Sequence, residues 1–132
     1  MNVIVCVEDK MGMLFNKRRV SQDSVLRERL RALIGKKTLF VSAYTEKQFR
    51  EKTGLAVCED FDALPAGEFC FVEDPAMLPK EENTERLYLY RWNRRYPADR
   101  FFGADLSKWN LEKKEDFQGS SHEKITEEVY SK

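Results

Sequence analysis

The feature that most constrains the fold is an unbroken apolar run at residues 3–7, Val-Ile-Val-Cys-Val. This run is rich in β-branched residues and ends at the turn-forming sequence Glu8-Asp9-Lys10. A strand that is apolar at every position is usually buried on both faces, as in a parallel sheet covered by other layers. The chain is therefore expected to build a central sheet around this strand.

Two later segments have helical patterns. In residues 21–34 the large aliphatic side chains fall on one face, so the sequence predicts a helix that Ser21 caps and Gly35 ends. Thr45 is expected to cap a shorter helix whose inner face includes Phe49. The stretch before the first helix, residues 11–20, is expected to form a loop.

Short apolar runs alternate with these helices. Further buried strands are predicted at residues 38–41, 55–58, 69–72 and 86–92, with a helical turn at 61–64. Residues 122–130 fit either a helix or an alternating strand. The order predicts an α/β fold: one domain over residues 1–132, with a mostly parallel twisted sheet, helices on both faces and antiparallel C-terminal strands.

Composition limits the function classes. The chain has 132 residues, of which 42% are hydrophobic, enough for one core. Its 23 Lys and Arg balance 23 Asp and Glu, so no net field attracts nucleic acid or anionic lipid, and any such role needs a local patch. Neither a membrane-spanning run nor a leader pattern is visible, and a cytoplasmic, non-membrane protein is expected.

A catalytic metal is not expected. The chain has a single histidine, His122, whereas hydrolytic zinc sites usually combine two or three histidines with carboxylates. Zinc chemistry of the ribonuclease Z type, a name that short chains of this kind sometimes carry, is therefore excluded.

The order of motifs resembles that of dihydrofolate reductase over nearly the whole chain. The matching stretches are residues 3–12, 20–24, 37–45 and 86–90, followed by Asp99, Phe101, Phe102, Trp109 and Ser121-His122. The resemblance implies the fold of that family. It also implies a ligand site at the mouth formed by residues 13–23 and 42–45, where Ser42 and Thr45 fall on the cofactor-phosphate turn.

Three positions depart from the family pattern. Glu73 and Asp74 replace the glycine pair that lets the backbone approach the cofactor pyrophosphate, and Ala43 replaces the arginine that grips a cofactor phosphate. Two added side chains block close approach, and their negative charges repel a polyphosphate. NADPH is therefore disfavoured as a cofactor.

Asp23 has two interpretations. At the start of a helix its carboxylate is a favourable cap for free N–H groups. The resemblance instead implies that Asp23 binds the amidine-like edge of a pterin, purine or pyrimidine, and in a reductase it would be the proton-relay acid.

Other polar clusters carry weaker hypotheses. A catalytic triad built on His122 with Ser120 or Ser121 is disfavoured, because neighbouring residues point in different directions and no third, orienting residue is visible. The pairs Glu81-Glu82 and Glu127-Glu128 are expected to be solvated surface carboxylates.

Two basic segments allow a nucleic-acid role. Residues 91–96 combine arginines with aromatics, a composition typical of single-strand binding, and residues 17–19 could extend the patch. The candidate contacts for a ligand or nucleic acid are Asn16, Arg18, Arg19, Arg91, Arg94 and Arg95.

The leading hypothesis is a protein that is not a reductase and binds a small heterocyclic or nucleotide-like ligand, or a partner. The alternatives are an NADPH-dependent reductase and an RNA-associated protein.

Overall fold

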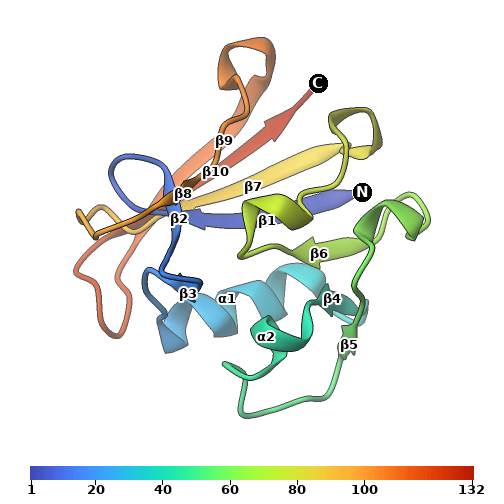
Figure 1. Cartoon of the computed structure of the whole chain (residues 1–132), viewed down its shortest axis with the longest axis horizontal. Coiled ribbons are helices and arrows are strands. Elements are labelled where there is room, and N and C mark those ends of the chain that lie inside the picture. The colour runs from blue at the N-terminus through green and yellow to red at the C-terminus, as the bar shows by residue number, and fades with distance from the viewer.

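The computed structural model describes all 132 residues. The strands are β1 (Asn2–Val7), β2 (Gly12–Phe15), β3 (Arg18–Arg19), β4 (Leu39–Val41), β5 (Leu55–Val57), β6 (Phe69–Phe71), β7 (Arg86–Arg91), β8 (Arg100–Phe101), β9 (Asn110–Phe117) and β10 (Ile125–Ser131). The α-helices are α1 (Ser24–Ile34) and α2 (Ala43–Glu46), and the single-turn 3-10 helices are η1 (Phe61–Ala63), η2 (Pro75–Met77), η3 (Glu81–Asn83) and η4 (Leu106–Lys108). Figure 1 shows their arrangement.

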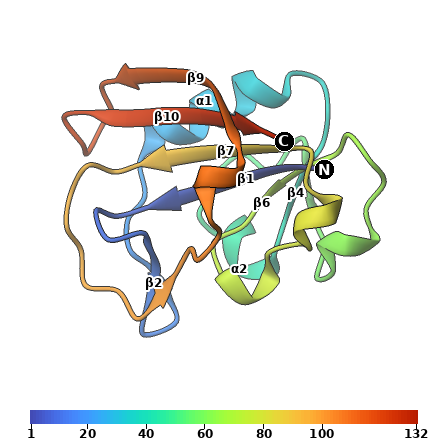
Figure 2. The ribbon, with the colours of Figure 1, turned by 90° about the horizontal axis from the view of Figure 1, so that it is seen from above.

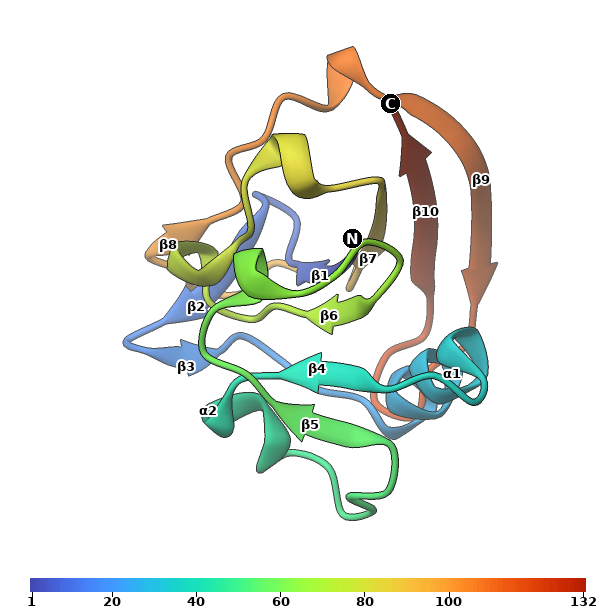
Figure 3. The ribbon, with the colours of Figure 1, turned by 90° about the vertical axis from the view of Figure 1, so that its right-hand side faces the viewer.

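A seven-stranded sheet forms the centre of the molecule, in the order β5-β4-β6-β1-β7-β10-β9. The strands from β5 to β7 pair in parallel, whereas β10 runs antiparallel to both β7 and β9. Figure 2 shows β9, β10, β7 and β1 side by side, and Figure 3 shows the twist of the sheet. The predicted α/β class, the mostly parallel twisted sheet and its antiparallel C-terminal strands are confirmed.

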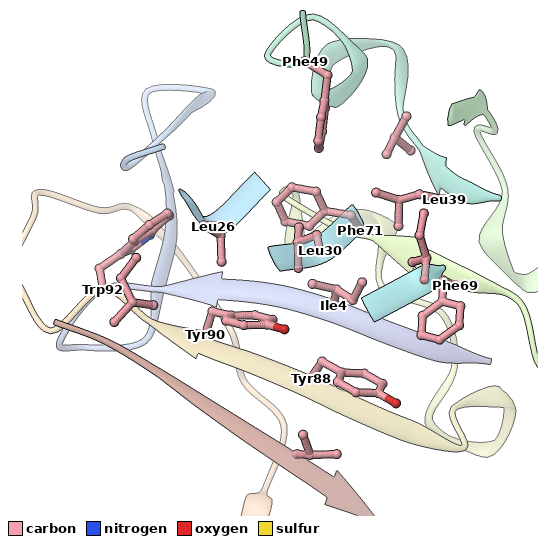
Figure 4. Packing of buried hydrophobic residues seen from close by; sticks show 14 residues of the cluster. Ile4, Leu26, Leu30, Leu39, Phe49, Phe69, Phe71, Tyr88, Tyr90 and Trp92 are labelled. Atoms are coloured by element: carbon pink, nitrogen blue, oxygen red, sulfur yellow. The ribbon is translucent and has the colours of Figure 1, made fainter. Parts of the chain in front are cut away.

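The apolar run of β1 is buried on both faces, as predicted. Ile4 packs on one face with Leu26 and Leu30 of α1, as Figure 4 shows, whereas Val3 and Val5 pack on the opposite face. Side chains along β7 also alternate between the two faces of the sheet. Tyr88, Tyr90 and Trp92 lie on the face covered by α1, and Leu87 and Leu89 lie on the opposite face. The β1 position at the centre of the sheet follows from this two-sided burial.

The two faces are covered by helices of different kinds. α1 covers the face of Ile4, together with Phe49, which follows α2. The opposite face is covered by single-turn 3-10 helices, through Phe61 of η1, Met77 of η2 and Leu106 of η4.

Both predicted helix caps were wrong by two or three residues. α1 is capped by Asp23 and not by Ser21, since the Asp23 carboxylate accepts hydrogen bonds from the backbone N–H groups of Val25 and Leu26. α2 is capped by Ser42 and not by Thr45, and it is only four residues long. In each case a better-placed acceptor stands next to the first helical residue.

The predicted loop at residues 11–20 is instead a β-hairpin. β2 and β3 pair through a two-residue turn at Asn16 and Lys17, whose φ angles are 50° and 64°. A turn with two positive φ angles matches the twist of paired strands. β2 also pairs with β8, which brings residues 12–15 beside residues 100–101 in a second, three-stranded sheet.

Residues 125–131 form the strand alternative of the two that the sequence allowed. The prediction that Glu127 and Glu128 are solvated was wrong, because their exposed fractions are 4% and 5%. Glu127 accepts from Tyr90 Oη at 2.6 Å and pairs with Arg29 at 3.3 Å. Glu128 pairs with Arg91 at 2.8 Å on the opposite face. Cations on neighbouring elements thus compensate the burial of both carboxylates.

Candidate functional site

An open cleft lies where β4 and β6 end. Figure 3 shows these strand ends on the side of the molecule that carries β2, β3 and β8. Its volume is about 1090 Å³. The residues that line it are Leu14, Asn16, Lys17, Ser42, Ala43, Tyr44, Glu59, Glu73, Asp74, Pro75, Ala76, Met77, Asp99, Arg100 and Phe101. The carboxyl ends of parallel strands are where α/β proteins place their ligand sites.

Acidic side chains outnumber basic ones in this cleft. It contains four carboxylates but only two cations, Lys17 and Arg100. Three of the carboxylates bind backbone N–H groups through one oxygen: Glu59 accepts from Ala43, Asp74 from Ala76 and Asp99 from Asn16. The second oxygen of each carboxylate binds no protein donor and is available to a ligand.

The residues predicted to hold a cofactor phosphate bind each other. Ser42 Oγ accepts from the Thr45 backbone N–H at 3.1 Å and donates to Thr45 Oγ1 at 3.0 Å. Ser42 lines the cleft, but the Thr45 side chain is fully buried. A carboxylate of the protein already lies at the start of α2, because Glu59 accepts a hydrogen bond from the Ala43 backbone N–H at 3.3 Å. A ligand phosphate at this turn would have to displace that carboxylate.

Glu73 lines both the cleft and a small space beside it, and Arg19 lines that small space. Their side chains form an ion pair at 2.9 Å, and the Arg19 guanidinium lies over the Tyr44 ring at 4.3 Å. The adjacent space, lined by Cys6, Ser21, Trp92 and neighbouring residues, has a volume of about 10 Å³. That is room for one water molecule at most, so a heterocyclic ring does not fit between this ion pair and the start of α1.

Protein donors surround the Asp23 carboxylate. Oδ1 accepts from the backbone N–H groups of Val25, Leu26 and Ser120 and from the Ser120 hydroxyl, and Oδ2 accepts from the Ser121 N–H at 2.8 Å. A Cβ atom at Gly119 would lie 2.4 Å from Asp23 Oδ2, so glycine is needed there for the loop to approach this closely. The Asp23 carboxylate thus has the contacts of a structural cap.

His122 completes the environment of Asp23. Its Nδ1 lies 3.0 Å from Asp23 Oδ2, and its Nε2 lies 3.0 Å from Ser21 Oγ and 2.9 Å from Tyr96 Oη. The ring stacks on Trp92 with centroids 4.5 Å apart. Burial on its own would raise the pKa of Asp23, but the hydrogen bonds from His122, Ser120, Ser121 and Leu26 hold that pKa well below its usual value.

Comparisons with known proteins address the fold. No family model matches the sequence, and no curated protein matches it. Among solved structures, dihydrofolate reductase from Enterococcus faecalis, complexed with NADP(H) and RAB-propyl, matches with a TM-score of 0.65 at 11% sequence identity. The match covers 98% of this chain and 94% of that one. The chain has the dihydrofolate reductase fold. The fold that the sequence resemblance implied is therefore confirmed.

The arginines that the sequence predicted to contact a ligand or nucleic acid fall into two groups in the structure. Arg91 pairs with the buried Glu128, and Arg19 pairs with Glu73, so carboxylates of the protein already compensate both guanidinium groups. Arg18, Arg94 and Arg95 are exposed, as is Asn16 in the hairpin turn. None of these three arginines forms an ion pair.

Several residues of these sites were not found from the sequence. The cleft residues Glu59 and Arg100 come from a loop and a short strand without a motif, and Asp99 was noted only as one of the residues that match the dihydrofolate reductase order. Tyr96 was noted only as part of a basic-aromatic segment, and Ser21 only as a helix cap. No local pattern could have placed either beside His122, which is 101 residues from Ser21 and 26 from Tyr96.

Two further findings concern metals and membranes. No group of three or more His, Cys, Asp or Glu side chains is arranged to hold a metal ion. No helix of this dihydrofolate reductase fold has the length and apolar character needed to cross a bilayer.

Proposed function

We propose that the protein binds a small heterocyclic ligand bearing amino groups in the cleft at the ends of β4 and β6, without using NADPH. The observation that carries this proposal is the acidic lining: Glu59, Asp74 and Asp99 each have a carboxylate oxygen without a protein donor. Amino or amidine N–H groups pair with such oxygens, and these charge-assisted hydrogen bonds are stronger than neutral ones. Tyr44 and Phe101 supply aromatic surface for a flat ring.

The same lining argues against a dinucleotide. The structurally similar enzyme was solved with NADP(H) bound, but the sequence resemblance puts Glu73, Asp74 and Ala43 at the turns that bind the cofactor in that family. Asp74 places a negative charge beside the cleft, whereas Arg19 compensates the charge of Glu73. The Glu59 carboxylate already accepts the first backbone N–H of α2. The carboxylates would repel a polyphosphate, and position 43 is an alanine, which cannot bind a phosphate as an arginine would.

The reductase alternative also needs Asp23 to reach a substrate ring. The surrounding donors saturate its carboxylate, and the space near the ion pair of Arg19 and Glu73 is about 10 Å³. A proton relay through Asp23 would require the loop at 119–122 and the Arg19 side chain to move together. The geometry therefore favours binding in the outer cleft over hydride transfer beside Asp23.

A thermal-shift screen tests this proposal. The panel contains 2,4-diaminopyrimidine, pterin, cytidine and adenosine as amino heterocycles, with NADPH and ATP as phosphate-bearing competitors. Stabilisation by at least one amino heterocycle, but not by NADPH, is the expected result, because a ligand that binds the native state raises the unfolding temperature. Stabilisation by micromolar NADPH, or by none of the amino heterocycles, would contradict the proposal.

A second candidate function is binding of single-stranded nucleic acid, and one observation favours it. The fold brings the two basic segments together: Arg18 lines one shallow groove with Tyr96, and Arg95 lines the next groove with Phe101. We define the basic-aromatic surface as Lys10, Phe15, Arg18, Arg95, Arg100 and Phe101. None of its four cations forms an ion pair, and its two phenylalanines are 48% and 47% exposed.

The basic-aromatic surface has the two components that unpaired nucleic acid requires. Free cations attract backbone phosphates, and exposed aromatic rings stack with bases. The neutral net charge of the chain does not prevent a local basic surface, although Asp99 of the cleft directly precedes Arg100 and Glu8 lines the groove of Lys10 and Arg95.

A further inference from the structure

We propose that Ser21 is a nucleophile activated by His122, forming a site for acyl transfer that is separate from the cleft. Ser21 Oγ lies 3.0 Å from His122 Nε2, and His122 Nδ1 lies 3.0 Å from Asp23 Oδ2. This is the nucleophile, base and orienting carboxylate order that recurs in serine hydrolases on unrelated folds. None of the three residues lines the cleft.

The tautomer of His122 follows from its neighbours. The Asp23 carboxylate can only accept, so Nδ1 carries the proton and donates to Oδ2, which leaves the lone pair of Nε2 facing Ser21. Backbone N–H groups fix both oxygens of Asp23, and Trp92 stacks against the imidazole. Asp23 is thus a positioning residue, which orients the base and stabilises the imidazolium that forms during transfer.

Ser21 is partly exposed, whereas the other two members are buried. Ser21 has intermediate exposure, and His122 and Asp23 are 3% and 1% exposed. No protein acceptor binds the backbone N–H groups of Ser21 and Gln22, the type of donor that stabilises an oxyanion. The site therefore combines a partly exposed nucleophile, a buried base and two backbone donors without a protein acceptor.

The neighbouring groove indicates the substrate class. It has a volume of about 320 Å³ and is lined by Phe15, Arg18, Val20 and Tyr96, among others. Ser21 itself lines only the space of about 10 Å³ behind the groove, so an ester has to reach Ser21 Oγ from the groove, past the Tyr96 hydroxyl at 3.4 Å. Arg18 is exposed and unpaired at this groove. These features suit a small carboxylic ester that carries an anionic group for Arg18.

The proposed reaction conserves atoms and protons. The Ser21 hydroxyl proton passes to His122 Nε2 as Oγ bonds to the ester carbonyl carbon. The bond from this carbon to the alcohol oxygen then breaks, and the alcohol leaves with the proton from Nε2. Water repeats the sequence on the acyl-serine, which releases the acid and restores both residues.

Tyr96 limits the resting reactivity of the serine. Its hydroxyl lies 2.9 Å from the same Nε2 and 3.4 Å from Ser21 Oγ. The lone pair on Nε2 accepts one hydroxyl proton at a time, so Ser21 is activated in molecules where its own hydroxyl donates to His122.

Labelling with a fluorophosphonate tests this proposal. The full-length protein is incubated with the reagent, which forms an O–P bond to an activated serine as fluoride leaves, and the modified peptide is identified by mass spectrometry. Labelling at Ser21 is expected, and Ser21→Ala should abolish it. The matched control is Ser107→Ala, because Ser107 Oγ also contacts a carboxylate, Asp105 at 2.6 Å, but no imidazole. This control should label like the unmodified chain.

His122→Gln tests the role of the base. Glutamine can still donate to Asp23, and circular dichroism verifies that the variant is folded. Labelling should slow by about 100-fold or more, the usual contribution of a general base. Absence of labelling at Ser21 in the unmodified chain, or an unchanged rate in folded His122→Gln, would overturn the proposal.

Discussion

Asp23 Oδ2 lies 3.0 Å from His122 Nδ1, which joins residues 99 positions apart in the chain. This contact connects the first turn of α1 to the segment between β9 and β10. The same carboxylate caps α1 and holds the backbone of Ser120 and Ser121. One side chain therefore fixes the position of the helix relative to the antiparallel end of the sheet.

Asp23→Ala is expected to destabilise the protein by about 3 kcal/mol or more. Loss of a helix cap costs about 0.5–2 kcal/mol, and each buried donor left without an acceptor adds about 1–3 kcal/mol. Urea denaturation measures the loss. Asp105→Ala is the control, because Asp105 caps only the exposed η4, and it should cost about 1 kcal/mol or less. Equal losses in the two variants would contradict the structural role of Asp23.

Stability is expected to fall in acid. Burial on its own would raise the pKa of Asp23, Glu127 and Glu128, but their hydrogen bonds and ion pairs hold all three below the usual values. Because each pKa is lower in the folded state, the unfolded state binds protons first as the pH falls. The stabilisation is complete above about pH 5 and is lost progressively below it. Urea midpoints at pH 7, 5, 4 and 3 should therefore decrease, and a midpoint that stays constant to pH 3 would refute this.

The central fold could be predicted because its signals are local. The five apolar residues of β1 and the alternation along β7 specify strands buried on two faces. Parallel pairing follows from the helix between successive strands. The turn at Asn16 and Lys17 was missed, because a two-residue turn with positive φ is normally marked by glycine and neither residue is one.

The site could be predicted only in part, because its contacts join distant segments. Asp23 and His122 were both singled out, yet nothing in the sequence indicates that they touch. Glu127 and Glu128 look like surface residues until Arg29 and Arg91 are brought beside them by α1 and β7. Charge compensation of buried carboxylates depends on tertiary structure, and sequence patterns do not report it.

Asp74→Asn is expected to weaken binding of an amino heterocycle in the cleft. Asparagine caps a helix nearly as well as aspartate, so η2 should form, but the cleft loses one negative charge. A loss of about 1.5–3 kcal/mol, roughly 10- to 150-fold in Kd, corresponds to one hydrogen bond to a charged group. Calorimetric titration with the best compound of the screen measures the change.

Asp105→Asn is the matched control for this titration. Asp105 caps η4 through the same type of contact, to the Ser107 N–H at 3.0 Å, but does not line the cleft. Its Kd should equal that of the unmodified chain. If Asp74→Asn binds as tightly as Asp105→Asn, the Asp74 carboxylate does not contact the ligand.

The basic-aromatic surface is expected to bind single-stranded oligonucleotides with a strong dependence on salt. Each phosphate neutralised by Lys or Arg contributes about −0.7 to the slope of log K against log salt for a single strand. Removing two of the cations with Arg18→Gln and Arg95→Gln should make the slope shallower by about 1.4. Fluorescence anisotropy with a labelled oligonucleotide at several salt concentrations measures the slopes. Arg50→Gln removes an exposed arginine outside this surface and should leave the slope unchanged. A change in slope for Arg50→Gln equal to that for Arg18→Gln or Arg95→Gln would mean that the oligonucleotide is attracted to the whole protein and not to the basic-aromatic surface.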